Sequence, residues 1–131
     1  MILVDTSVWI DWLHAGSRPA TALLDRLIDE VDIVSTPVVL QELLQGARGP
    51  EHLLELRAHF QQLPQLLPTP GTYAEAGALY ARCRWSGITV RSPHDCLIAR
   101  IAIEGAVPLL QDDRDFGLIA RVEPLLRLVA V

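Results

Sequence analysis

Carboxylates are the residues of this sequence whose types and spacing could do chemistry. Asp5 follows an apolar run at the N-terminus, Glu42 lies within a helical pattern, and Asp95 is the third residue after Ser92. A further acidic stretch, residues 111–115, contains three aspartates. If these groups meet at one edge of a sheet, they repel one another by on the order of several kcal/mol at short range. They must then share protons or bind a cation.

Oxygen donors alone make the set of ligands that Mg²⁺ or Mn²⁺ prefers. Two such ions, about 4 Å apart, can hold the attacking water and the leaving oxygen of a phosphodiester. All eleven basic residues are arginine, and the chain contains no lysine. Schiff-base chemistry, Walker A phosphate binding and haloacid-dehalogenase-like or receiver phosphoaspartate chemistry need a lysine, and they are therefore excluded. Metal-dependent phosphodiester hydrolysis is the chemistry that the acids themselves favour.

Each acid also has a purely structural interpretation. Asp5 precedes Thr6-Ser7 and could cap a helix. Asp95 occupies a capping-box-like position at the positive end of a helix dipole. Residues 111–115 could form a polar turn, and Glu42 could be a solvated helix residue, although its neighbours are apolar. The joint occurrence of these acids at strand ends and helix starts favours a shared site.

The elements that must position these acids alternate along the chain. Strands are predicted at residues 1–4, 32–35 and 107–110, with weaker ones at 66–67 and 128–131. Helices are predicted at about 6–14, 19–28, 37–46, 50–62, 72–85 and 94–104, and a short helical turn at about 116–120. This alternation predicts a three-layer α/β/α domain with a central, mostly parallel sheet. Ligands of such sheets bind beyond the carboxyl ends of the strands.

Length and composition limit the remaining possibilities. The 131 residues suit a single domain, 1–131, without an internal repeat or long linker. The N-terminus lacks a basic region and no apolar run reaches about 18 residues, so we expect a cytoplasmic protein with no signal peptide and no membrane association. A net charge of −5 argues against non-specific coating of nucleic acid. RNA binding would need a local arginine cluster, for which the candidates are Arg82, Arg84, Arg91 and Arg114.

Four segments resemble the motifs of the PIN-domain family. The N-terminal MILVDTSVWI looks like its opening, and the later segments VLQELL (39–44), SPHDCLIA (92–99) and LLQDDRDF (109–116) are similar to its second, third and fourth motifs. Their order, their spacing and the total length resemble VapC toxins of bacterial toxin–antitoxin pairs. This resemblance runs over almost the whole chain.

The resemblance implies a PIN-like fold, a Mg²⁺-dependent endoribonuclease (with Mn²⁺ as a substitute) acting on cellular RNA, a neutralising VapB-type antitoxin and a homodimer. It maps the metal-binding, catalytic acids onto Asp5, Glu42, Asp95 and Asp113, with Asp115 as a fifth ligand. Thr6 or Ser7 would orient the first carboxylate. Because the family often has an amide where this chain has Asp112, the assignment within residues 112–115 stays open. The alternative is a catalytically inactive PIN-fold module that binds RNA or protein, and the intact acids argue against it.

An apolar stripe near the N-terminus has two interpretations. Val8, Trp9, Trp12 and Leu13 share one helical face, which could pack in the core or could bind a partner. The groove candidates for an antitoxin are Trp9, Trp12, Leu13 and Leu43. We expect a surface or capping role for His94, since a site made of carboxylate oxygens does not need it.

Overall fold

The sheet at the centre of the molecule is short and fully parallel. The computed structural model describes residues 1–131, and its three strands are β1 (Ile2–Val4), β2 (Ile33–Val34) and β3 (Leu109–Leu110). They lie in the order β2-β1-β3, with Leu3 opposite both Val34 and Leu109. All seven strand residues are buried, as expected for a sheet that is covered on both faces.

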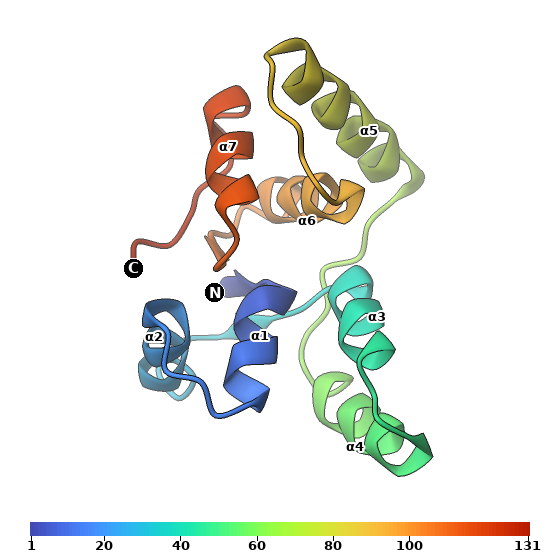
Figure 1. The fold of residues 1–131 in the computed structure, drawn as a ribbon, viewed down its shortest axis with the longest axis vertical. Helices are drawn as coiled ribbons and strands as arrows, with labels where there is room; N and C mark the ends of the chain where they lie inside the picture. The colour runs from blue at the N-terminus through green and yellow to red at the C-terminus, as the bar shows by residue number, and fades with distance from the viewer.

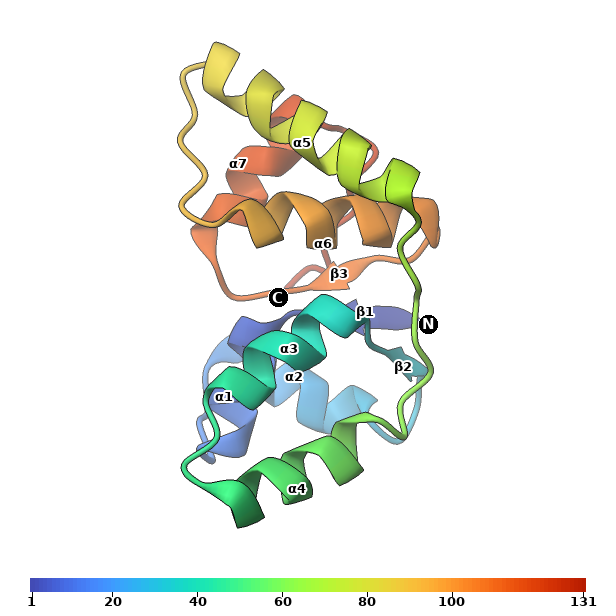
Figure 2. The same ribbon diagram turned by 90° about the vertical axis from the view of Figure 1, so that its right-hand side faces the viewer.

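Seven helices form the two outer layers. Figure 2 shows α5, α6 and α7 on one side of the sheet and α1 to α4 on the other, which confirms the expected α/β/α architecture. The same division is visible from the direction of Figure 1. The helices are α1 (Thr6–Leu13), α2 (Pro19–Leu27), α3 (Pro37–Gln45), α4 (Pro50–Phe60), α5 (Pro70–Trp85), α6 (Pro93–Glu104) and α7 (Arg114–Val122).

The two weak strands predicted at residues 66–67 and 128–131 do not form: a single bridge lies just before the first, at residue 65, and another at the start of the second, at residue 128. Residues 65 and 128 each pair with a single partner, Ser35 and Leu109 respectively. Two flanking prolines, Pro64 and Pro68, cannot donate to a ladder, which limits pairing in the first case. Five helices begin with proline at the first turn, and α5 starts at Pro70 rather than at residue 72.

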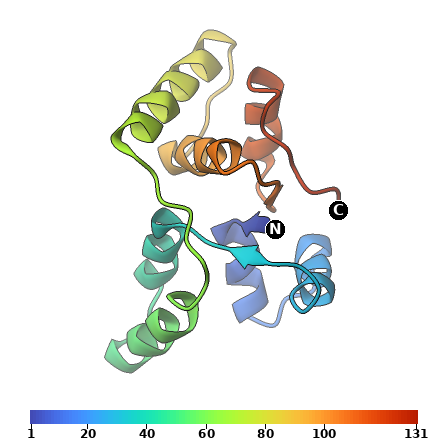
Figure 3. The ribbon, with the colours of Figure 1, turned by 180° about the vertical axis from the view of Figure 1, so that it is seen from behind.

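Short polar contacts fix the segment between α4 and α5. Figure 3 shows this segment running along the side of the molecule from the layer of α4 to that of α5. Thr36 precedes α3 as expected of a cap, but its hydroxyl donates to the carbonyl of Leu66 at 2.7 Å instead of capping the helix. At the start of α5, Thr69 and Thr72 form a reciprocal capping box. The segment between α4 and α5 is therefore fixed near Leu66 and at the start of α5.

Apolar side chains fill the space on both sides of the sheet. Trp9, Phe60 and Phe116 are the largest of the fully buried ones. Trp9 packs edge to face on Phe60, with the ring centroids 5.0 Å apart. No helix is both long enough and apolar enough to cross a membrane. The carboxyl ends of β1 and β3 lie at one edge of the sheet, where Asp5 and Gln111 follow them directly.

Candidate metal centre

Asp5 is the first acid of the site, and it is held rigidly. It follows β1, is 4% exposed and caps α1. Its Oδ2 accepts hydrogen bonds from the hydroxyl of Ser7 at 2.6 Å and from the Ser7 amide at 3.0 Å. Burial raises the pKa of Asp5 against these bonds, and the charge of Glu42 raises it further. The cap and the site acid are thus the same residue, and Ser7 is the residue that orients it.

Glu42 comes from α3 on the same side of the sheet. The hydroxyl of Thr6 donates to its Oε1 at 2.9 Å, so that Thr6 orients Glu42 rather than Asp5. The other carboxylate oxygen lies 3.7 Å from Nδ1 of His94, whose side chain is 40% exposed. The histidine therefore stands at the edge of the acids and not among them.

Asp95 is the acid without a compensating bond. It lies in the first turn of α6 and is 7% exposed. Its side chain forms no hydrogen bond, and its backbone N–H bonds to the carbonyl of Ser92 at 3.0 Å. The side-chain capping interpretation is therefore wrong. Burial, followed by the charges of Asp5, Asp113, Glu42 and Asp115 in that order, raises the pKa of Asp95 to about 7.

Asp113 and Asp115 are bound by one arginine. Oδ1 of Asp113 accepts from the Asp115 amide and from Nη2 of Arg91, both at 2.9 Å. Oδ2 of Asp115 accepts from the Arg91 amide at 3.0 Å and from its Nε at 3.1 Å. Burial alone would raise the pKa of Asp115, but these bonds outweigh it and hold that pKa below its usual range.

Asp112 faces away from the other acids. Its carboxylate pairs with Arg18, and this pairing lowers its pKa. Only its backbone approaches the site, through a 3.1 Å bond from its amide to the hydroxyl of Ser7. Among the three aspartates of this loop, Asp113 and Asp115 are the two whose carboxylates lie near Asp95.

The acids from four segments line a single cavity of about 330 Å³. Its polar lining comprises Asp5, Thr6, Ser7, Glu42, Arg91, Ser92, Asp95 and Asp113. One oxygen each of Asp95, Asp113 and Asp115 can be chosen within 4.8 Å of one another, close enough to share an ion. Hard oxygen donors, combined with the unneutralised Asp95, fit a divalent cation such as Mg²⁺ or Mn²⁺. The residues present therefore suit the metal that the family resemblance implies.

Arginines lie beside this cavity, though not all of those expected. A polar cavity of about 590 Å³ adjoins it, shares Arg91 and Asp113 with it, and is also lined by Arg18 and Arg114. Arg82 and Arg84 line neither cavity, because both belong to the last turn of α5. There Arg82 pairs with Glu123 at 3.1 Å. Sequence reasoning missed Arg18, whose partner Asp112 is 94 residues away.

The apolar stripe of α1 divides between the core and a groove. Trp9 is 1% exposed, so its assignment to a partner groove is wrong, because it packs on Phe60 in the core. Trp12 is partly buried and donates through Nε1 to Asp25 at 2.9 Å. Leu13 is 40% exposed and, with the buried Leu43, lines a cavity of about 190 Å³ between α1, α3 and α4. Glu42 belongs to this groove as well as to the acid cavity.

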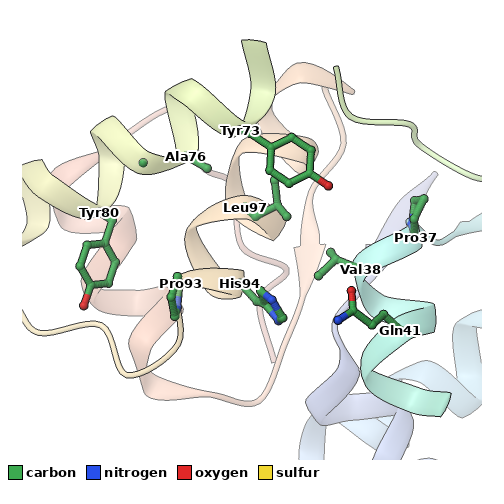
Figure 4. A pocket seen from close by; sticks show the side chains of 10 residues that line it. Pro37, Val38, Gln41, Tyr73, Ala76, Tyr80, Pro93, His94 and Leu97 are labelled. Carbon is green, nitrogen blue, oxygen red and sulfur yellow. The ribbon is translucent and has the colours of Figure 1, made fainter. Parts of the chain in front are cut away.

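A fourth, more apolar cavity of about 540 Å³ is lined in part by Gln41 and His94, the chain neighbours of Glu42 and Asp95. Figure 4 shows Tyr73 and Tyr80 of α5 facing Val38 of α3 across it, with His94 between them. Tyr73 is largely exposed, with an exposed fraction of 57% for the whole residue. The sequence had no pattern that pointed to this cavity, since α5 alternates apolar and polar residues without a distinct stripe.

Comparisons with known proteins agree with the fold. The family model for the PIN domain matches residues 2–122. Ribonuclease VapC11 of Mycobacterium tuberculosis is 34% identical over 128 residues, which is 95% of this chain and 96% of that protein. Among solved structures, VapBC2 of Rickettsia felis bound to a promoter DNA fragment has a TM-score of 0.75 at 20% identity, covering 98% of both chains. The sarcin-ricin-loop-cleaving toxin VapC20 of Mycobacterium tuberculosis has a TM-score of 0.70 at 20% identity, covering 89% and 93%.

The crowding of Asp95 should appear as a pH dependence of stability without metal. A folded-state pKa of about 7, above the ordinary value of 3.8, means that the folded protein binds the extra proton between those limits. Stability from this group is therefore present at low pH and is lost as the pH rises toward 7. Asp95→Asn should remove this loss and stabilise the metal-free protein at pH 8 by at least about 1 kcal/mol, which corresponds to about 4 °C in Tm.

Thermal melting in EDTA at pH 5 and pH 8 measures this effect. Asp32→Asn is the matched control, because Asp32 is exposed and lies outside the cavity. If Asp95→Asn melts at or below the parent temperature at pH 8, the crowding argument is wrong.

Proposed function

This chain belongs to the PIN-domain family, and we propose that it is a Mg²⁺-dependent endoribonuclease toxin of the VapC type. The observation that carries the proposal is the cavity at the sheet edge, where carboxylates from four separate segments converge. We assign the catalytic, metal-binding roles to Asp5, Glu42, Asp95 and Asp113. Asp115 is the fifth ligand. It is only 1% exposed, and Arg91 bonds to both Asp115 and Asp113.

The roles of the protein groups follow from their contacts. Ser7 and Thr6 hold Asp5 and Glu42 by hydroxyl bonds, so these two carboxylates are oriented before any ligand arrives. Asp95 has free oxygens and is the acid whose charge most needs a cation. A divalent ion bound there would supply activation of a water and neutralisation of the scissile phosphate.

The arginine-lined cavity suits the RNA backbone. Phosphate contacts dominate the affinity for nucleic acid, and this chain is acidic overall, so a local basic surface has to provide them. Arg18, Arg91 and Arg114 lie directly beside the acids and can grip phosphates through two parallel bonds. We therefore assign the RNA path to this cavity rather than to the end of α5.

An inactive interaction module is the weaker candidate. A chain that had lost its metal would have no reason to keep Asp95 buried, unbonded and surrounded by four other acids. Unpaired buried charge costs stability, and such a cost is retained where it serves a ligand.

Cleavage assays on two neighbouring aspartates test the site. Asp113→Asn should reduce Mg²⁺-dependent RNA cleavage by on the order of 10²-fold or more, because a lost ligand removes several kcal/mol of transition-state stabilisation. Asp112→Asn should cleave RNA at least tenfold faster than Asp113→Asn, because the Asp112 carboxylate faces Arg18 and not the other acids. Asp32→Asn again serves as the unaffected control. Equal losses at positions 112 and 113 would contradict the assignment, as would parent-rate cleavage by Asp113→Asn.

We assign the antitoxin to the groove between α1, α3 and α4. Its walls include the exposed side chains of Ile10 and Leu13, and Glu42 lies at its end. A partner segment that buries these apolar side chains would reach the acids, where an arginine of the antitoxin could pair with them. The solved VapBC complexes with a similar fold are consistent with such a partner.

Leu13→Asp should weaken binding of the antitoxin by at least tenfold, because it places a charge in an apolar contact. The affinity of the Leu13→Asp variant for Mn²⁺ should equal that of the parent. Trp12→Ala is less clean, since Trp12 also joins α1 to α2 through Asp25. Titration of the purified toxin with its antitoxin measures the first quantity, and calorimetry with Mn²⁺ measures the second. Unchanged antitoxin affinity would reject this groove.

We also propose that the chain forms a homodimer through the apolar cavity of α3, α5 and α6. The exposed ring of Tyr73 and the apolar lining beside it form a surface that a second copy would bury. This surface is separate from the groove assigned to the antitoxin, so both partners could bind at once.

Light scattering at tens of micromolar tests the dimer. The parent should have twice the mass of one chain, and Tyr73→Glu should shift it to the monomer because the new charge would be buried. Trp85→Glu is the matched control, since it adds the same charge at the other end of α5. A monomeric parent would contradict the dimer, and a dimeric Tyr73→Glu would contradict this face.

A further inference from the structure

Arg91 makes bonds to two of the acids that a role in gripping the RNA backbone does not explain. It is the only basic residue lining the acid cavity, where it faces four acidic residues. Its Nη2 donates to Oδ1 of Asp113 at 2.9 Å, on a carboxylate that the proposed function assigns to the metal. A guanidinium and a divalent ion would therefore compete for the same oxygen-lined space.

The side chain of Arg91 is not needed to position Asp115. The backbone amide of Arg91 already donates to Oδ2 of Asp115 at 3.0 Å, and a substitution at this position would keep that bond. The contribution of the side chain is its charge, delivered through Nε to Asp115 and through Nη2 to Asp113. Asp113 and Asp115 are therefore both paired with the Arg91 guanidinium, whereas no cation pairs with Asp95.

The guanidinium is also free to leave. Its side chain is 62% exposed, in contrast to the 1% of Asp115, and it opens onto the polar cavity that adjoins the acids. An exposed ion pair contributes little, on the order of 1 kcal/mol or less, so the bond to Asp113 can be given up at small cost.

We propose that Arg91 is the internal counter-cation of the metal centre, holding Asp113 in the metal-free protein and releasing it when a divalent ion binds. The inference rests on the proposed function, because it takes Asp113 as a ligand. Its consequence is that Arg91 lowers the affinity for metal while it keeps the empty cluster of acids from repelling itself. It is a positioning residue, and not a group that must touch the reacting atoms.

Calorimetric titration of the full chain with Mn²⁺ tests the proposal. Arg91→Gln keeps the backbone bond to Asp115 and removes the charge, so it should bind Mn²⁺ about three- to tenfold more tightly than the parent and melt at a lower temperature in EDTA. Arg91→Lys keeps the charge and should stay near the parent affinity. Arg18→Gln is the matched control: it is 63% exposed and paired with an aspartate outside the cluster, and its affinity should equal that of the parent within twofold.

Each outcome decides the matter. An unchanged or weaker affinity for Arg91→Gln would overturn the role of Arg91 and leave the metal centre standing. Equal tightening by Arg18→Gln would reduce the effect to net charge and would also overturn it. A parent that binds no Mn²⁺ would overturn both this inference and the proposed function.

A measurement on the parent avoids dependence on the folding of a variant. The chain has eleven arginines and no lysine, so guanidinium signals in ¹⁵N NMR are few and free of ammonium signals. Addition of Mg²⁺ should speed the rotation of the Arg91 Nη groups and leave the Arg18 signals unchanged. A guanidinium of Arg91 that stays as restrained as before would overturn the proposal.

Discussion

Repulsion among carboxylates at one edge of the sheet is the constraint on which the rest of this structure depends. Each acid except one has a specific neighbour that fixes it: a serine or threonine hydroxyl for Asp5 and Glu42, and the guanidinium of Arg91 for Asp113 and Asp115. Only Asp95 is left with burial and like charge alone, and its pKa of about 7 records that imbalance. The fold around the site is an arrangement for keeping negative charge close together.

Parallel strands and helix starts bring this about. The carboxyl ends of β1 and β3 lie side by side, so Asp5 and the 111–115 loop meet although more than a hundred residues separate them. The acids at the starts of α6 and α7 lie at helix N-termini, where the helix dipole favours negative charge. The buried strands between the two helical layers hold these ends at a fixed distance. Backbone geometry therefore brings the acids together, and the hydrogen bonds and ion pairs of neighbouring side chains reduce the repulsion among them.

Most of the fold could be predicted from local patterns, and the site only in part. Capping residues, proline-led helix starts and apolar runs located six helices and the three strands, because these signals are local. The seventh helix, α7, was expected only as a short turn at 116–120 but runs from Arg114 to Val122. The pairing of Asp112 with Arg18 and the burial of Trp9 against Phe60 depend on residues far apart in the chain, which no local pattern reports. Arg82 was misplaced for a similar reason, since nearness to Asp95 in sequence is undone by the loop after α5.

Glu42 has a consequence that comes from its double membership. It belongs to the wall of the acid cavity and also to the end of the groove between α1, α3 and α4. A molecule that binds in one of these two cavities and changes the charge or position of the Glu42 side chain therefore changes the binding affinity of the other cavity. Thermodynamic linkage makes such coupling reciprocal: whatever factor a groove occupant applies to the affinity of the acid cavity, the ion applies to the affinity of the groove. Glu42 thus couples the binding equilibrium of the groove to that of the acid cavity.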